Sequence, residues 1–144
     1  MLSLSLIYVV STILVLISFL HFYWVAGGRW ALEVVVPEVM EKSFFDPDKK
    51  VMTGLYTLIV AIGLLVFAFV LLNNLPTISF LGKGLTTIGT RVIGSIFLIR
   101  AVGDFKVAGF FKQASQHPFA KYDTLIFSPL CLFLGVSCWL ITVL

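Results

Sequence analysis

The sequence predicts an all-α, polytopic membrane protein built as an antiparallel bundle of four transmembrane helices. Hydrophobic residues make up 60% of the 144 residues and charged residues 12%, whereas soluble domains average about 45–50% and about 25%. The apolar residues gather into four stretches, at about residues 2–26, 51–72, 84–103 and 124–144. Each is long enough to cross a bilayer as a helix, which takes about 20 residues. We therefore expect a single membrane domain over residues 1–144.

The first stretch is free of charged residues and should end at Gly27 and Gly28, because glycine tolerates the backbone conformation that follows a helix. Its start lacks the positive region of a secretory signal, so we expect it to stay attached. The connection that follows contains Pro37, which can open a short helix over residues 37–43. Asp46 and the proline after it then predict a turn before the second stretch.

The third stretch differs from the others because it carries Arg91 and Arg100 and is followed by Asp104. Residues 104–112 alternate aromatic with basic residues, a pattern that suits a short helix lying at the lipid surface. A solvated loop is the alternative interpretation. In the fourth stretch, a helix capped by Asp123 would hold a proline about one turn inside and should be kinked there.

Small residues recur at heptad-like spacing along the predicted helices. The fourth helix has the clearest stripe, which consists of Ser128, Cys131, Gly135, Cys138 and Thr142. Small faces let membrane helices approach closely, and a repeat of about 3.5 residues favours left-handed crossing. The two cysteines are seven residues apart on one helix, about 10 Å, which is too far for a disulfide. We interpret them as small packing residues.

The basic residues predict the orientation of the chain in the membrane. The two long connections, 27–50 and 104–123, lie on one side, and the short connection 73–83 lies on the other. The long connections hold Arg29, Lys42, Lys49, Lys50, Lys106, Lys112 and Lys121. The short one holds only Lys83. Because lysine and arginine favour the cytoplasmic side, we expect a multi-pass protein of the cell membrane with both termini outside.

Matching depths between antiparallel helices predicts one polar cluster near the end of the bundle that carries the long connections. Each helix contributes to this level, and the contributing residues are His21, Thr57, Arg100 with Asp104, and Ser128 with Pro129. Ionisable residues within a membrane are costly and are functional candidates by default. Our candidate ligand-binding residues are His21, Trp24, Arg100 and Asp104, while Arg91, Thr57, Ser128 and Pro129 have secondary or structural roles.

Arg100 and Asp104 are four residues apart and can pair on one helix face. Such a pair is compatible with a purely structural role or with a cavity that holds an anionic or polar head group. Arg91 points to the opposite face, where it can snorkel outward or meet Ser11 and Thr12 of the first helix. His21 has no companion ligands for a metal. The sequence thus predicts no metal, no cofactor and no nucleic-acid partner.

Three strings of the sequence carry a resemblance to a known family. They are His21-Phe-Tyr-Trp24-Val-Ala-Gly27-Gly28, Arg100-Ala-Val-Gly103-Asp104-Phe and Tyr122-Asp123-Thr-Leu-Ile-Phe-Ser128-Pro129-Leu-Cys131. With these strings, nearly the whole chain resembles a family of small bacterial four-helix membrane proteins that is described as a domain of unknown function. The resemblance implies a four-span protein of the inner membrane. It implies no activity, cofactor or catalytic residue.

Three classes of function are compatible with this pattern. A bundle could bind, and act on, a small amphipathic molecule such as a lipid or an isoprenoid, with Arg100 and His21 at its polar end. It could instead be an accessory or assembly subunit that meets a membrane-protein partner, a second copy or anionic lipid. A transporter or channel is the weakest, because one four-helix unit shows no inverted repeat. The first class is narrowly favoured, and a ligand-sized cavity beside Arg100 would separate it from the second.

Overall fold

The structure is a computed structural model that describes residues 1–37, 46, 49–78, 80–113 and 116–144. The first part of the described chain forms helix α1 (Leu2–Val25) and the short helix α2 (Leu32–Val35). Two long helices follow, α4 (Lys50–Leu72) and α5 (Lys83–Val102). The last part is helical from Pro118 onward. It consists of α6 (Pro118–Tyr122), the π-helical turn η1 (Asp123–Phe127) and α7 (Ser128–Ile141).

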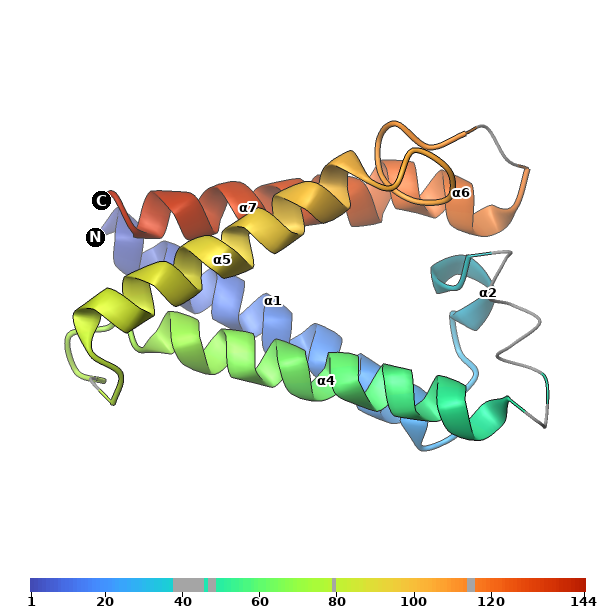
Figure 1. The fold of residues 1–144 in the computed structure, drawn as a ribbon, viewed down its shortest axis with the longest axis horizontal. Helices are drawn as coiled ribbons and strands as arrows, with labels where there is room; N and C mark the ends of the chain where they lie inside the picture. Colours follow the sequence, from blue (N-terminus) through green and yellow to red (C-terminus); the bar gives the residue numbers. More distant parts are fainter. Residues whose placement is uncertain (38–45, 47–48, 79, 114–115) are drawn as a thin grey trace.

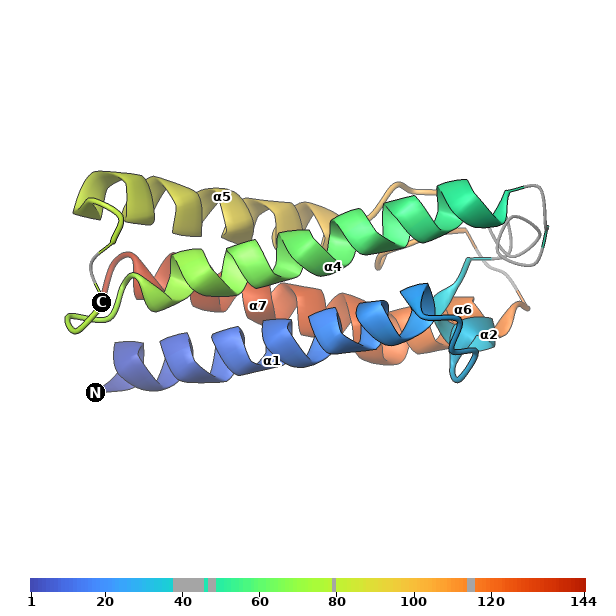
Figure 2. The same cartoon turned by 90° about the horizontal axis from the view of Figure 1, so that it is seen from below.

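The long helices lie side by side along the long axis of the molecule (Figures 1 and 2). Both termini and the connection between α4 and α5 lie at one end, whereas α2 and α6 lie at the other (Figure 1). We call the latter the α2/α6 end. Four helical segments, Leu2–Val25, Val51–Leu72, Lys83–Val102 and Pro118–Ile141, are long and apolar enough to cross a membrane. The predicted antiparallel four-helix bundle is therefore confirmed.

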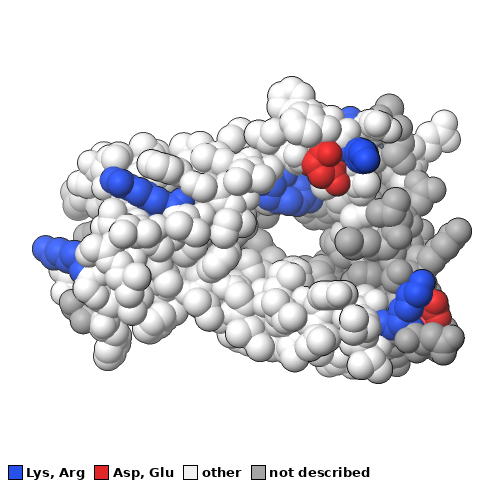
Figure 3. All heavy atoms as spheres, in the orientation of Figure 1, with Lys and Arg blue, Asp and Glu red and all other residues white. Residues whose placement is uncertain are grey.

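The bundle consists of two helix pairs. α1 packs mainly against α4, and α5 packs mainly against α7, with fewer contacts between the pairs. The pairs approach each other near the chain termini and separate toward the α2/α6 end (Figure 1). The space-filling view shows the molecule hollowed between the two pairs in this region (Figure 3). We refer to this feature as the hollow.

The first pair is joined by a hydrogen bond as well as by apolar packing. Ser18 of α1 is fully buried, and its hydroxyl donates to the backbone carbonyl of Ala61 in α4 at 2.7 Å. Apolar side chains of both helices continue the core toward the chain termini, with Leu14 and Leu71 completely buried. α1 ends at Val25, and the left-handed conformation of Gly27, with φ of 96°, confirms the predicted glycine stop.

The second pair is held by two glycines that face each other. A Cβ atom added to Gly94 of α5 would lie 3.0 Å from the backbone oxygen of Gly135 in α7. In the other direction, a Cβ atom on Gly135 would lie 2.9 Å from the backbone oxygen of Gly94 and 2.7 Å from Leu98 Cγ. The predicted close approach at the small-residue stripe is thus confirmed, while the left-handed crossing stays a prediction. Both cysteines are free thiols.

The fourth helix begins earlier than the sequence suggested. Asp123 does not cap it, because the chain is already helical from Pro118, with the Nδ1 atom of His117 accepting the amide N–H of Phe119 at 3.3 Å. Proline suits this first helical position, since it has no N–H to leave unpaired. The extension carries Asp123 into the helix and buries it. The irregularity expected from Pro129 takes the form of the π-helical turn that precedes it.

The second long connection differs from the expected interfacial helix. Most of the predicted helix at residues 37–43 lies outside the described residues. Residues 104–112 do not form the predicted helix, because Gly103, Phe105 and Gly109 have left-handed φ angles of 93°, 62° and 94°. These angles interrupt any regular right-handed helix. The segment is a folded loop, and whether it lies at the lipid surface stays a prediction.

Replacing Gly135 by leucine should destabilise the bundle by about 1–3 kcal/mol, because the new side chain meets α5 with no space to fill. Gly63→Leu in α4 is the matched control, since a Cβ atom there has no neighbour within 4 Å. Thermal unfolding of both variants in detergent measures the difference. Equal midpoints for the two variants would contradict the close approach of α5 and α7.

Candidate functional site

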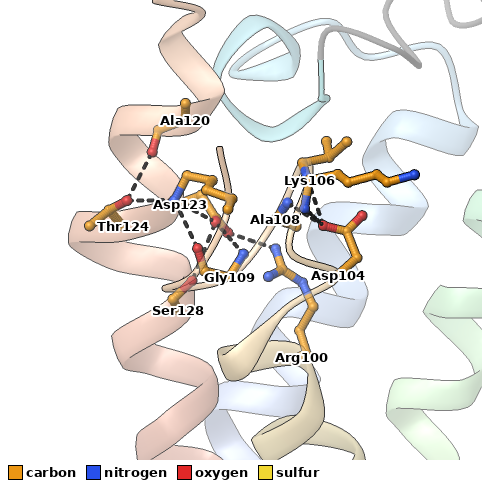
Figure 4. A network of polar contacts seen from close by, with 11 residues as sticks. Arg100, Asp104, Lys106, Ala108, Gly109, Ala120, Asp123, Thr124 and Ser128 are labelled. Carbon is orange, nitrogen blue, oxygen red and sulfur yellow. Dashed lines mark hydrogen bonds and ion pairs between the residues drawn. The ribbon is translucent and has the colours of Figure 1, made fainter. Parts of the chain in front are cut away.

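A buried carboxylate is the centre of the polar cluster at the α2/α6 end. Asp123 is 0% exposed, and its Oδ1 atom accepts a hydrogen bond from Nη2 of Arg100 at 2.7 Å. Its Oδ2 atom accepts the amide N–H of Gly109 at 2.7 Å and the hydroxyl of Ser128 at 3.3 Å. The ammonium group of Lys112 lies 3.1 Å from the same oxygen. Figure 4 shows how Arg100, Gly109 and Ser128 converge on this carboxylate from α5, the following loop and α7.

Lys112 is the second cation of the cluster, and its side chain is only 6% exposed. Its ammonium group also donates to the carbonyl of Gly109 at 3.0 Å and to the hydroxyl of Thr124. The buried carboxylate therefore has two cationic neighbours, Arg100 and Lys112, and the three groups together carry one net positive charge. Strong pairing is expected here, since a buried ion is stable only where partners and hydrogen bonds replace its water.

The loop after α5 folds back onto the end of that helix. The amide of Phe110 donates to the carbonyl of Ala101 at 2.8 Å, so the loop satisfies a carbonyl that the helix leaves unpaired. The return is so tight that a Cβ atom on Gly103 would lie 1.8 Å from the carbonyl oxygen of Ala108, and one on Gly109 would lie 2.3 Å from the Cα atom of Gly103. Only glycine fits these two positions, and their contact places the amide of Gly109 against Asp123.

Asp104 holds this loop together and does not pair with Arg100. Its Oδ1 atom accepts the backbone N–H groups of Lys106, Val107 and Ala108 at 3.0, 2.7 and 3.0 Å. These three donors lower the pKa of the exposed carboxyl to about 2, so it is ionised at neutral pH. The predicted Arg100–Asp104 pair is therefore wrong. α5 ends at Val102, so the two residues do not lie on one helix, and the carboxylate of Asp104 turns to its own loop.

Arg100 leaves part of its guanidinium uncommitted. One hydrogen bond, from Nη2 to Asp123, is formed among the described residues, whereas Nη1 is shielded from solvent and has no partner there. The side chain as a whole is 36% exposed. Arg100 is the basic residue of the last turn of α5, and positive side chains lie over the end of this helix at the edge of the hollow (Figure 3). The site thus presents an arginine with one donor that is shielded from solvent and has no partner among the described residues.

The other predicted ligand-binding residues form a separate group at the end of α1. The Nδ1–H group of His21 donates to the carbonyl of Ile17 at 2.8 Å, and its ring stacks edge-on against Trp24 with the centroids 5.0 Å apart. The indole N–H of Trp24 donates to the carbonyl of Trp30 at 2.9 Å. No hydrogen bond joins these residues to Arg100 among the described part of the chain. They share the α2/α6 end with Arg100 because α1 and α5 both end there (Figure 1).

The structure also places the four residues for which we predicted secondary or structural roles. Thr57 is buried and donates to the carbonyl of Thr53 one turn earlier, which explains its polarity within α4. Ser128 joins the cluster, and Pro129 follows it at the start of α7. Arg91 meets α7 and not the first helix. Its Nε–H donates to the hydroxyl of Thr142 at 3.2 Å, and its guanidinium lies 5.6 Å from the centroid of the Trp139 ring.

Three residues at the centre of the cluster were not among the predicted site residues: Asp123, Lys112 and Gly109. Asp123 was taken for a helix cap, although His117-Pro118 was a signal for an earlier start that would have placed this carboxylate inside the helix. Lys112 was counted only for membrane orientation. Gly109 contributes through its backbone, and the repetition of glycine at positions 103 and 109 was the available signal for a tight loop.

Metal chemistry receives no support from the described residues, among which no group of three histidine, cysteine, aspartate or glutamate side chains could hold an ion. The fold and the apolar spans define the protein as a multi-pass helical membrane protein. The chain belongs to the family described as "Protein of unknown function (DUF3995)", which it matches over residues 14–138. This range includes the whole Arg100–Asp123 cluster. No curated protein and no solved structure matches the chain.

Replacing Asp123 by asparagine should destabilise the protein by about 3 kcal/mol, because the buried Lys112 and the partly exposed Arg100 lose the carboxylate that neutralises them. The matched control is Asp104→Asn, which should unfold almost like the native protein, since an amide oxygen can still accept the three loop N–H groups. Thermal unfolding in detergent compares the two variants. A larger loss for Asp104→Asn than for Asp123→Asn would contradict the assigned ion pair.

Proposed function

We propose that the protein binds a small amphipathic molecule, such as a lipid or an isoprenoid, in the hollow between its two helix pairs. The observation that carries this proposal is the state of Arg100, whose guanidinium is anchored by Asp123 through Nη2 while Nη1 has no hydrogen-bond partner among the described residues. A shielded donor without an acceptor is costly, and it calls for a polar group that could satisfy it.

The surroundings of Arg100 favour a ligand with an apolar tail. The hollow lies between helices that are long and apolar enough to span a bilayer (Figure 3). Ligand sites in helical bundles commonly lie between helices, with apolar walls and few polar groups. A polar head group beside Arg100 and a hydrocarbon tail between the helix pairs match this distribution. His21 and Trp24 are the candidate contacts from the α1 side of the hollow.

An accessory or assembly subunit is the second candidate function. The observation in its favour is the saturation of Asp123, whose two oxygens receive Arg100, Lys112, Gly109 and Ser128. A network this complete could serve only to lock α5, its loop and the fourth helix together, with no ligand involved. The two functions differ in a measurable way, because only the binding function requires a small molecule to stabilise the isolated protein.

Ligand-dependent thermal stability tests the proposal. We expect amphiphiles from a bacterial lipid extract to raise the unfolding midpoint of the native protein in detergent. Arg100→Gln should abolish this increase, since the neutral amide cannot hold an anionic or strongly polar head group in the same way. Adding both Asp123→Asn and Lys112→Gln to this change removes all three charges of the cluster and should recover much of the basal stability without restoring the ligand effect.

Arg91→Gln is the matched control, because it removes the same charge from α5 at a position bound to Thr142 and distant from the cluster. Its ligand response should equal that of the native protein. If no extract raises the native midpoint, or if both arginine variants lose the effect equally, the binding function fails and the accessory function takes its place.

We propose further that both termini lie outside the cytoplasm. The asymmetry of lysine and arginine supports this orientation, since the α2/α6 end carries the long basic connections. Cysteine introduced at Lys106, which is exposed in the loop after α5, should be labelled by an impermeant thiol reagent only after the cells are opened. Cysteine at the exposed Lys83 should react in intact cells. The reverse pattern would invert the orientation and leave the bundle unchanged.

A further inference from the structure

Building on the proposed function, we infer that the head group accepted beside Arg100 carries one negative charge. The inference rests on a count of the charges that converge on the Asp123 carboxylate. Arg100 and Lys112 each contribute a positive charge, and Asp123 contributes a negative one. The three groups therefore carry a surplus of one positive charge at the α2/α6 end.

The surplus cannot be dissipated easily by water. Lys112 is 6% exposed and Asp123 is 0% exposed, so solvent screens their charges far less than it screens that of Arg100, which is 36% exposed. The nearby charges of Asp104 and Lys106 do not change the count, because they are opposite in sign and both residues are exposed (Figure 4). One negative charge on a ligand would make the cluster neutral.

The geometry indicates where that charge is held. Nη2 of Arg100 is committed to Asp123, and Lys112 is occupied by Asp123, Gly109 and Thr124. Arg100 Nη1 is the donor without a partner. Because Nη1 is shielded from solvent, the ligand oxygen is assigned to the exposed part of the Arg100 side chain, which is 36% exposed as a whole, and Lys112 contributes by its charge. A carboxylate and a phosphodiester both present a single negative charge to such a donor. A second negative charge on the ligand would give the cluster and the ligand together one net negative charge.

A ligand series with one acyl chain and different head groups tests this inference in phosphatidylcholine nanodiscs. The series comprises lysophosphatidylglycerol with one negative charge, monoacylglycerol with none, zwitterionic lysophosphatidylcholine and lysophosphatidic acid with nearly two. Dissociation constants are measured for the native protein. We expect the monoanion to bind at least about tenfold more tightly than the uncharged and zwitterionic members, with no further gain from the second charge. Laurate, compared with lauryl alcohol, should show the same preference.

Two lysine variants separate a charge effect from a loss of structure. Lys112→Gln keeps a group that can donate to the carbonyl of Gly109 but makes the cluster neutral, so the preference for the monoanion over the uncharged ligand should fall about tenfold. Lys106→Gln removes the same charge from an exposed position and should leave the preference unchanged. If Lys112→Gln does not fold, the dissociation constants of the ligand series for the native protein still test the single-charge inference.

The outcomes distinguish the inference from the function on which it rests. Equal binding of all four head groups, or clearly tightest binding of lysophosphatidic acid, overturns the single-charge inference while amphiphile binding stands. Absence of binding by every member overturns both. Glycerophosphoglycerol, which is the singly charged head group of lysophosphatidylglycerol without its tail, and inorganic phosphate identify the source of the charge. If either binds as tightly as lysophosphatidylglycerol, the apolar hollow contributes nothing and the proposed amphipathic ligand is wrong.

Discussion

The carboxylate of Asp123 is the interaction on which the α2/α6 end depends. A charge within a membrane span is stable only if other groups replace its water. Here the replacement comes from α5 through Arg100, from the following loop through Gly109 and Lys112, and from α7 through Ser128. All four groups bind the same carboxylate. Their contacts therefore fix the end of α5, the loop and the start of the fourth helix relative to one another. The need to replace the water of this carboxylate explains the position of most of the site residues.

The two helix pairs are held by different means, and the difference explains why the hollow lies where it does. Lipid supplies no hydrophobic force to bring membrane helices together, so close backbone approach and hydrogen bonds decide the packing. α5 and α7 meet at Gly94 and Gly135, and α1 meets α4 through the bond from Ser18 to Ala61. Comparable contacts between the pairs are concentrated toward the chain termini. At the opposite end the pairs separate, and the Arg100–Asp123 cluster lies at that end (Figure 1).

The sequence predicted the spans well because length and hydropathy determine them. The first three helices begin and end within a residue or two of expectation. The sequence predicted at which end of the bundle the polar cluster lies, but not which residue pairs with Arg100. The rule that pairs residues four apart holds inside a helix, and the turn at Gly103 removes Asp104 from that helix. Asp123 could not be recognised as the partner without knowing that the fourth helix starts at Pro118, and the contact of Gly109 arises from a fold of the loop that no local pattern specifies.

The buried carboxylate also bears on how the protein enters its membrane. A helix that carries an unpaired aspartate is a poor substrate for the insertion machinery, since the charge can cost up to about 2.5–3.5 kcal/mol. Both cations that neutralise Asp123 precede the fourth helix in the chain, on α5 and in the 103–113 loop. The third span and its loop are thus already present to receive the fourth. The order of the chain is therefore compatible with insertion of the third and fourth helices as one hairpin, in which Arg100 and Lys112 pair with Asp123 as the fourth helix enters.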